Sequence, residues 1–484
     1  MAKVHDVIIV GTGFAGLCMA IALRQMQRHD FLLLERAQEV GGTWRDNAYP
    51  GAACDVPSHL YSLSFFPKAD WSRKYPTQPE LFAYLKRIAR THNLYPQIRF
   101  QENLLEAKYL TQTKVWQVTT SQGQYLARSL IMGTGGLAEP KLPDVPGVES
   151  FRGKTFHSAR WEDSYAPTGK RVAVVGSGAS AIQIVPELVK QKAQVTVFQR
   201  TPNWIIPRFD RPYSALEKQL FKHVPGVRRA HRAAIYWGHE ARVMGMVIHP
   251  ALMKLFQKVA ELHIRRQVKD RELRELVTPE YLIGCRRILI SNHWYPALQA
   301  SNCTLRAEGI SEVTPTGVIT ASGEALSFDV MVYATGFYAT ENPIAKRIKG
   351  PEQRLSEAWA EGEEAYLGTT VAGFPNLYMI IGPNTGLGHT SMIFMIEQQV
   401  KLIQKLLRHQ TQKGAQTLAV KPEVQKQFNQ QLQRRLQQSV WATGCNSWYQ
   451  HRNGKITALW PGFTFEFWWQ TQRFSPSDYE LNTF

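Results

Sequence analysis

Residues 6–16 read DVIIVGTGFAG, an apolar run that passes straight into three spaced glycines. The run is typical of a buried strand, and the residues after it have the composition of a helix. In this setting Gly11 permits a tight turn and Gly16 lets the helix pack closely on the strand, while Gly13 leaves room for a pyrophosphate against the backbone. The phosphates would then lie at the positive end of the helix. A glycine turn with a purely structural role is the alternative.

An acidic residue follows the next predicted strand, Phe31–Leu34. Glu35 lies 24 residues beyond Gly11, at the point where a dinucleotide-binding fold places a carboxylate that hydrogen-bonds a ribose 2′-hydroxyl. The same carboxylate would repel a 2′-phosphate. The first turn therefore favours FAD or NAD over NADP.

A second turn of the same kind, GSGASA at residues 176–181, follows the apolar run Arg171–Val175. Alanine in its third position is an accepted replacement for the helix-packing glycine. At the offset that Glu35 has in the first unit stands Arg200, whose guanidinium is always charged and can bind a phosphate through two hydrogen bonds. This turn therefore predicts NADPH, unless Arg200 is merely an exposed cation at a strand end. The residues that we expect around NADPH are Gly176, Gly178, Ser180, Arg200 and Thr201.

Two nucleotide sites in one chain, one marked by an acid and one by an arginine, predict a flavoprotein that NADPH reduces. The fold class that follows is α/β, with two Rossmann-like dinucleotide-binding domains. The five cysteines are scattered and contain no CxxC pair, which argues against a disulfide framework, a thiol-redox centre and a structural zinc site. We expect no metal, and electrons that pass to a quinone or to oxygen rather than to a disulfide.

The chain has a formal net charge of +18. It contains no recognisable nucleic-acid-binding module, so we expect no nucleic-acid partner. Two roles for this charge stay open: a basic surface that attracts an anionic cofactor, and peripheral membrane contact through basic helical segments near residues 228–232 and 254–274. The chain shows no signal-peptide pattern and no apolar run long enough to span a membrane, and its odd number of cysteines fits a reducing compartment, so we expect a cytoplasmic protein.

The chain divides at changes in composition. Residues 138–147 contain three prolines and are typical of a linker. Residues 214–276 are basic and helical in pattern, and residues 396–438 have the Gln- and Lys-rich pattern of an amphipathic surface helix. The aromatic-rich end, residues 441–469, is expected to pack into the fold. We expect an FAD-binding domain at 1–140 and 335–484, an NADP-binding domain at 150–205 and 283–330, and a helical insertion at 210–280.

Residues 151–162, FRGKTFHSARWE, match the pattern FxGxxxHxxxW. This fingerprint resembles that of the Baeyer–Villiger monooxygenases, and nearly the whole chain contains segments similar to that family. The family continues after the tryptophan with Pro or Asp, whereas Glu162 stands here, and the related heteroatom-oxygenating flavin monooxygenases carry a similar motif. The matching fingerprint residues are Phe151, Gly153, His157 and Trp161, and the other similar segments are GGTW (41–44), YPGAACDVPS (49–58), CRR (285–287), YATGF (333–337), GPNTGLGH (382–389) and CNSWY (445–449).

The resemblance implies roles for particular residues. Arg287 would lie beside the flavin ring, supported by Asp55, and would stabilise an anionic C4a-peroxyflavin and the oxyanion formed when it attacks a carbonyl. His157 and Trp161 would couple the two nucleotide domains rather than take part in the chemistry. Trp448 would lie near the nicotinamide, although a core aromatic residue explains it nearly as well. Gly42, Thr43 and Trp44 would contact the flavin.

The activity that the resemblance implies is insertion of one oxygen atom next to the carbonyl of a small-molecule ketone, together with sulfide oxidation. NADPH would supply the electrons, FAD would be the prosthetic group, and molecular oxygen would supply the inserted atom. The protein would be a monomer or a weak oligomer. The main alternative is a heteroatom-oxygenating flavin monooxygenase, which Glu162 favours. A flavin oxidase that releases peroxide and a non-enzymatic basic binding protein are further alternatives.

Overall fold

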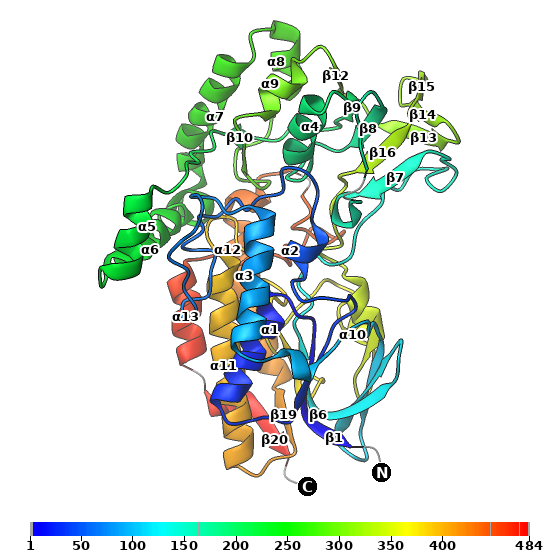
Figure 1. The fold of residues 1–484 in the computed structure, drawn as a ribbon. Coiled ribbons are helices and arrows are strands. Elements are labelled where there is room, and N and C mark those ends of the chain that lie inside the picture. The colour runs from blue at the N-terminus through cyan, green and yellow to red at the C-terminus, as the bar shows by residue number, and fades with distance from the viewer. Residues whose placement is uncertain (1–2, 163–164, 446, 474, 483–484) are drawn as a thin grey trace.

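The computed structural model describes residues 3–162, 165–445, 447–473 and 475–482, which form two lobes (Figure 1). One lobe contains both chain ends, and the other is formed by the middle of the chain. Each lobe is built on a sheet with helices packed against it. This arrangement confirms the predicted α/β class with two dinucleotide-binding units.

The sheet of the first lobe is formed around β1, which pairs in parallel with β2 and β6. Ile9 of β1 lies opposite Leu33 and Ile131, and all three side chains are buried. The order along the sheet is β17 (Ile348–Lys349), β4 (Leu104–Leu110), β5 (Val115–Thr120), β6 (Gln124–Met132), β1 (Val4–Val10), β2 (Phe31–Leu34) and β3 (Ile98–Arg99), with β18 (Leu377–Met379) also paired to β6.

Helices cover this sheet and extend beyond it. The longest, α11, packs along α1. The helices are α1 (Phe14–Gln25), α2 (Thr43–Asp46), α3 (Gln78–Thr91), α10 (Leu355–Ala358), α11 (Met392–Gln412), α12 (Pro422–Gln437) and α13 (Thr464–Gln472), with short turns η1 (Tyr95–Gln97), η5 (Pro343–Arg347), η6 (Val440–Ala442) and η7 (Pro476–Asp478) and an antiparallel pair, β19 (Thr417–Val420) and β20 (Tyr479–Asn482).

The sheet of the second lobe is fully parallel. β8 spans the residues predicted for it. The order is β12 (Cys303–Arg306), β9 (Gln194–Phe198), β8 (Arg171–Val175), β16 (Val330–Tyr333) and β7 (Lys154–His157), accompanied by η2 (Ser158–Arg160), α4 (Ala181–Lys190), α9 (Trp294–Leu298) and an antiparallel sheet of β13 (Ile310–Thr314), β14 (Gly317–Thr320) and β15 (Ala325–Ser327).

A helical insertion projects from the second lobe (Figure 1), and its helices lie between Ala215 and Val277, in the part of the chain with the helical pattern. Its base is closed by parallel pairing of β10 (Ile205–Ile206) with β11 (Leu289–Ile290). Met246 of the insertion, Val174 of β8 and Trp441 of the C-terminal segment belong to one buried cluster, so the insertion is anchored in the core. Its elements are α5 (Ala215–His223), α6 (Val227–Glu240), η3 (Met244–Ile248), η4 (Pro250–Leu252), α7 (Met253–Gln267) and α8 (Arg271–Val277).

The prediction of a surface helix over residues 396–438 is wrong. The segment contains most of α11, then β19, then α12, and about half of α11 is buried. Gln399 shows why the pattern misled: its buried amide donates to the carbonyl of Gly368 at 2.8 Å and accepts from the N–H of Ile381 at 2.9 Å. A glutamine whose amide makes its hydrogen bonds inside the protein cannot be distinguished in the sequence from a surface glutamine.

The expectation that the aromatic-rich end packs inside is only partly met. Trp441 and Trp460 are buried, but Trp448, Trp468 and Trp469 are exposed. Among the described residues, no helix is long and apolar enough to cross a membrane.

Candidate active site

The first glycine turn leaves one open position. Gly11 has φ +99°, and a Cβ on it would lie 2.7 Å from the carbonyl oxygen of Gly133. A Cβ on Gly16 would lie 1.9 Å from the carbonyl oxygen of Gly11, so α1 packs as closely as the sequence predicts. At Gly13 the nearest atom to such a Cβ is the Cα of Gly42, at 3.8 Å. The turn therefore has space at Gly13, at the N-terminus of α1, where a pyrophosphate fits.

Glu35 is buried at the end of β2 and points back to this turn. Its carboxylate accepts hydrogen bonds from the N–H and the hydroxyl of Thr12, at 3.1 and 2.5 Å, and pairs with Arg45 at 2.9 Å. A fixed carboxylate beside the turn fits recognition of a ribose. Arg45 was missed from the sequence, although it directly follows the GGTW segment.

The GGTW segment faces the first turn, and the helix α2 that begins within it contacts the other lobe. Thr43 begins α2, and the indole N–H of Trp44 donates to the hydroxyl of Tyr61 at 3.3 Å. Asp46 at the end of α2 pairs with Arg36 at 3.2 Å and lies 3.7 Å from Arg160. Because Arg160 follows the fingerprint histidine, Asp46 connects the two lobes.

The second glycine turn repeats the construction of the first. Gly176 has φ +115°, and a Cβ on it would lie 2.6 Å from the carbonyl oxygen of Ala334. A Cβ on Gly178 would meet nothing within 4 Å. Ala181 is buried at the start of α4, and Ser180 occupies the N-cap position without a side-chain capping bond. The open position again lies at a helix N-terminus.

Arg200 lies just beyond β9, exposed to solvent. Its aliphatic carbons pass beside Gly309. Within the described part of the chain no acidic side chain pairs with Arg200, so its charge is available to a ligand. The backbone carbonyl of the adjacent Thr201 accepts a hydrogen bond from Ser177 at 3.4 Å, which connects this strand end to the glycine turn.

The fingerprint segment is structural in its contacts. Phe151 is buried, and a Cβ on Gly153 would clash with the Phe151 ring and with the carbonyl oxygen of Asp329, at 2.5 and 2.7 Å. Trp161 stacks on Phe156 with ring centroids 5.1 Å apart. These residues pack the start of the segment against the second lobe.

His157 joins the fingerprint to the YATGF segment. Its Nδ1 accepts from the N–H of Ala159 at 3.1 Å, and its Nε2 donates to the carbonyl of Gly336 at 3.0 Å. Burial lowers the pKa of His157 to about 4, so the ring is neutral at pH 7. Both ring nitrogens therefore make hydrogen bonds within the protein, one of them to the YATGF segment.

Asp55 and Arg287, separated by 232 residues, form an ion pair. Asp55 Oδ2 accepts from Nε at 3.0 Å and from Nη2 at 2.6 Å, and about a third of each side chain is exposed. Burial raises the pKa of the Asp55 carboxyl, but the charge of Arg287 outweighs this effect and holds that pKa below its ordinary value. The carboxylate in turn raises the pKa of Arg287. Both groups are therefore charged at pH 7.

One further residue, Gln183, fixes the segment that carries Asp55. The side-chain oxygen of Gln183 on α4 accepts from the hydroxyl of Tyr49 at 3.0 Å, and its amide donates to the carbonyl of Ala53 at 3.0 Å. Tyr61 accepts the hydrogen bond from Trp44. Burial raises the pKa of the Tyr61 hydroxyl, and the charges of Asp55 and Arg287 also act on that pKa. The ion pair thus lies between α4 of the second lobe and two segments of the first lobe, residues 41–44 and 49–58. Gln183 was missed from the sequence, since only the fold brings α4 to this segment.

A disulfide overturns one sequence-based expectation. Cys285 and Cys445, 160 residues apart, are bonded, whereas the scattered cysteines argued against a disulfide framework and their odd number fitted a reducing compartment. The spacing could not reveal the pair, because the C-terminal segment returns to the second lobe only in the folded protein. Cys285 lies two residues before Arg287, so the bond ties the arginine segment to the C-terminal loop. Cys18, Cys54 and Cys303 are free.

The C-terminal loop was predicted to contact the nicotinamide. Asn446 of its CNSWY segment lies outside the described residues. Trp448 is 46% exposed and is therefore not a core residue. Tyr449 is buried close to Arg287. Burial raises the pKa of the Tyr449 hydroxyl to about 12, and the charge of Arg287 also acts on that pKa. A pocket of about 570 Å³ lies beside this loop and is lined by Gln437, Ala442, Gly444, Cys445, Gln450, His451, Arg452, Gly454 and Ile456.

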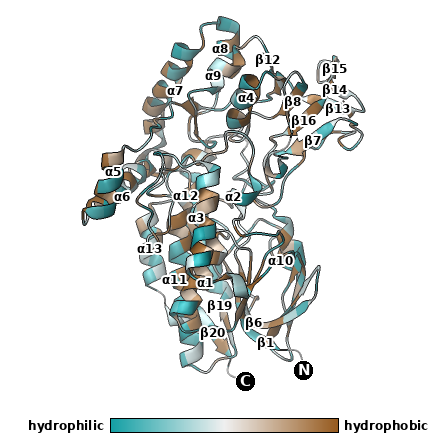
Figure 2. Ribbon diagram, viewed as in Figure 1, coloured by the Kyte–Doolittle hydropathy of each residue, from teal (hydrophilic) through white to brown (hydrophobic). Residues whose placement is uncertain are grey.

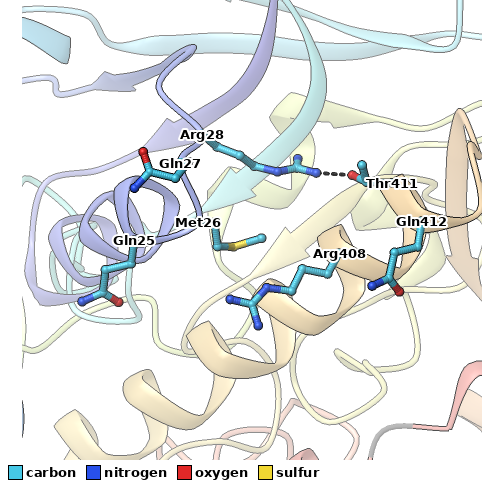
Figure 3. Close-up of a pocket in the computed structure, with 7 residues that line it drawn as sticks. All are labelled: Gln25, Met26, Gln27, Arg28, Arg408, Thr411 and Gln412. Atoms are coloured by element: carbon cyan, nitrogen blue, oxygen red, sulfur yellow. Dashed lines mark hydrogen bonds between the residues drawn. The ribbon is translucent and has the colours of Figure 1, made fainter.

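A second pocket, of about 370 Å³, lies away from these groups (Figure 3). It is formed by the ends of α1 and α11, where Arg28 donates to Thr411. None of the predicted site residues lines it. Among the described residues, no group of three or more His, Cys, Asp or Glu side chains could hold a metal ion.

Comparison with known proteins bears on this site. The family model that matches residues 8–224 is described as pyridine nucleotide-disulphide oxidoreductase. A Baeyer–Villiger monooxygenase of Pseudomonas aeruginosa is 45% identical, covering 100% of this chain and 92% of that protein, and one of Streptomyces coelicolor is 42% identical, covering 99% and 93%. The crystal structure of OTEMO in complex with FAD and NADP aligns with a TM-score of 0.89 at 26% identity, covering 99% of this chain and 100% of that one.

Proposed function

The chain belongs to the Baeyer–Villiger monooxygenases, and from this premise we propose how its own residues hold the cofactors and carry out the oxygenation. It is an FAD- and NADPH-dependent enzyme that uses molecular oxygen to insert one oxygen atom next to the carbonyl of a small-molecule ketone. When bound, the flavin accepts a hydride from NADPH and activates oxygen. Recognition, orientation and charge stabilisation fall to the protein.

FAD is held by the first turn. Gly13 gives the pyrophosphate access to the backbone, and Glu35 binds the ribose, a role that its fixed carboxylate supports. Arg45 neutralises Glu35 and orients it. Gly42, Thr43 and Trp44 contact the flavin from the segment that faces Gly13.

NADPH is held by the second turn. Gly178 lies open at the N-terminus of α4, and Ser180 has no capping bond of its own. Arg200 binds the 2′-phosphate, because it is exposed at the strand end and no acid of the described chain neutralises it. Trp448 covers the nicotinamide from the C-terminal loop.

The Asp55–Arg287 ion pair is the observation that carries the catalytic assignment. When a ketone is oxygenated, negative charge develops on the oxygen of its carbonyl group. A guanidinium that is held in place and cannot lose its proton stabilises such an anion. Asp55 fixes the orientation of Arg287 through its Nε and Nη2, and the Gln183 contacts fix Asp55.

Sulfide oxidation is a secondary activity in this proposal, because oxygen transfer to sulfur does not require an anionic oxidant. The experiment that tests the function uses the purified protein, NADPH and oxygen with a panel of ketones and sulfides, and identifies the products by mass. Esters or lactones from ketones are the expected result. Sulfoxides or N-oxides alone, across a broad ketone panel, would favour the heteroatom-oxygenating alternative.

The same proposal covers the organisation of the protein. The FAD-binding domain takes residues 1–140 and 335–484, the NADP-binding domain 150–205 and 283–330, and the insertion 210–280. The two sheets support this division, since their strands come from these ranges except for β16 (Val330–Tyr333), which continues three residues past 330. The enzyme works in the cytoplasm, where NADPH is available, as a monomer or weak oligomer, and contacts membranes peripherally through its basic helices.

A further inference from the structure

The insertion helices carry apolar side chains on their outward faces. Leu216, Leu220 and Val224 recur at four-residue intervals along α5 and its end, and all three are exposed, Leu216 by 69%. Residues at this spacing share one face of a helix. In Figure 2 brown and teal alternate along these outer helices, whereas the strands inside are brown.

Helix α7 has the same feature in a sharper form. Its inner face is filled by Ala260 and Ile264, which are buried. Leu255, Val259 and Leu262 form a second apolar stripe that faces solvent, with Leu255 exposed by 70%. A surface helix needs only one apolar stripe to pack on its protein. Among the described residues, none covers this second stripe.

Exposed aromatic residues extend this surface to the C-terminal helix. The rings of Trp237 on α6 and Phe465 on α13 lie 6.1 Å apart, and Trp237 is 58% exposed. Glu240 holds the two helices together, because its carboxylate accepts from both the N–H and the hydroxyl of Thr464 at 2.8 Å. Trp468 and Trp469 add two further exposed indoles along α13.

The same surface is strongly basic. Residues 214–266 contain ten Lys and Arg against three Asp and Glu. Of the three acids, Glu240 is buried and Glu217 is paired with Arg211 at 2.6 Å. Exposed cations alternate with the apolar stripe of α7, and the guanidinium of Arg473 lies over the ring of Trp469 at 3.8 Å.

We propose that this surface, formed by α5, α6, α7 and α13, docks on an anionic phospholipid bilayer. Helices with exposed Leu and Trp flanked by Lys and Arg insert their apolar side chains at the headgroup boundary and attract anionic lipids. A protein partner is disfavoured, because the cores of protein interfaces are depleted of Lys. A symmetric second copy would bring the two sets of cations face to face.

The location of the surface gives the docking a consequence for the substrate. The inner side of α7 reaches the catalytic segment, since the methyl carbon of Met253 lies 3.0 Å from where a Cβ on Gly284 would be, three residues before Arg287. The insertion therefore separates the bilayer from the Asp55–Arg287 pair by one layer of structure. Resting on the proposed function, the inference names the substrates as lipophilic ketones that partition into the bilayer.

The test is flotation of the purified yellow holoenzyme with vesicles of phosphatidylglycerol and phosphatidylcholine, or of phosphatidylcholine alone. The native enzyme should float with the anionic vesicles and be released by salt. L255S/L262S and K254E/K258E should each bind at least tenfold more weakly, because each lost Lys or Leu removes a contact with the membrane. The matched controls are L105S, at a leucine of β4 that is 50% exposed, and K108E/K413E, at exposed lysines of the first lobe; both should bind like the native enzyme.

Light scattering and activity complete the experiment. All variants should keep bound flavin and native rates on a short, water-soluble ketone, whereas L255S/L262S should lose rate on a long-chain ketone embedded in vesicles. Equal binding of the native enzyme to both vesicle types, or native binding by both test variants, would overturn the docking. A native dimer that L255S/L262S converts to monomer, without vesicle binding, would assign the surface to a second copy instead. Vesicle binding without any ketone oxidation would leave the docking intact and refute the proposed function.

Discussion

At the scale of single residues, Arg287 has the most specific assignment. Its guanidinium donates to one oxygen of Asp55 through two nitrogens, so its position is set by geometry as well as by charge. Arg286 is its neighbour in sequence but lies over the ring of Tyr281 at 5.1 Å. The two arginines of the CRR segment therefore have different environments, and one can serve as the control for the other.

Arg287→Ala should abolish nearly all conversion of ketone to ester. Removing one preorganised charge donor costs roughly 10²–10³ in rate. Sulfide oxidation should suffer less, and NADPH oxidation should continue in part with release of hydrogen peroxide. Ester, sulfoxide and peroxide are measured in parallel, with Arg286→Ala as the matched variant. Ester formation at the native rate by Arg287→Ala would show that another residue stabilises the anion.

Arg200→Ala should raise KM for NADPH by roughly tenfold to hundredfold, the equivalent of about 1.5–3 kcal/mol for a lost charged hydrogen bond. KM for NADH should change little, because NADH has no 2′-phosphate. Arg171→Ala is the control, since Arg171 lies at the opposite end of the sheet strands and pairs with Asp329 at 2.9 Å. Steady-state kinetics with both cofactors decide the matter, and equal kinetics of the native enzyme with NADH and NADPH would contradict the assignment.

The residues that sequence alone could identify are those whose roles depend on local spacing. Gly11 is required because the turn gives it a φ of +99°, and Gly16 is required because Gly11, five residues earlier, lies directly against it. The partnership of Asp55 with Arg287 could not be derived in this way, because 232 residues separate them and only the resemblance to a family brought them together. Arg45 and Gln183 were missed for the same reason, since each acts through a contact that the fold creates.

At the scale of elements, strands were easier to predict than helices. The strands β2 and β8 have the predicted bounds, because runs of buried β-branched and apolar residues are bounded by glycine or charged residues. Helix α11 was misread, because Gln399 and Gln410 are polar in sequence but satisfied inside the core. The insertion was recognised as helical, but its outward apolar stripes could be identified only after the inner faces of the helices were known.

The Cys285–Cys445 bond is the element-scale link between the arginine segment and the C-terminal loop. Replacing both cysteines in C285S/C445S should lower the apparent Tm by a few degrees, since disulfides typically contribute about 2–5 kcal/mol. C303S, which removes a free thiol, is the control. Alkylation of the denatured, unreduced native protein should label three cysteines, and labelling should reach five after reduction. Five labelled cysteines without reductant would show that the pair is not bonded.

At the scale of the whole molecule, buried histidines make the fold sensitive to acid. Burial lowers the pKa of His59 to about 3 and the pKa values of His157 and His239 to about 4. The ordinary pKa of a histidine is about 6.5. Between these values the unfolded chain binds protons that the folded chain does not. Stability is therefore fully present above about pH 6.5 and is lost as the pH falls towards 4.

The apparent Tm should consequently fall between pH 7.5 and pH 5 at constant ionic strength. His59→Phe should flatten this dependence, because each such imidazole contributes up to about 1.4 kcal/mol per pH unit in this range. Phenylalanine suits the site, since the His59 ring lies among Tyr213, Phe221 and His231, with ring centroids 5.2, 4.5 and 5.1 Å away. His29→Phe, at an exposed histidine, should leave the slope unchanged. An unchanged dependence of Tm on pH in His59→Phe would mean that the His59 imidazole is protonated in the folded protein. The burial of His59 among aromatic rings and cationic side chains would then not be the cause of the acid sensitivity.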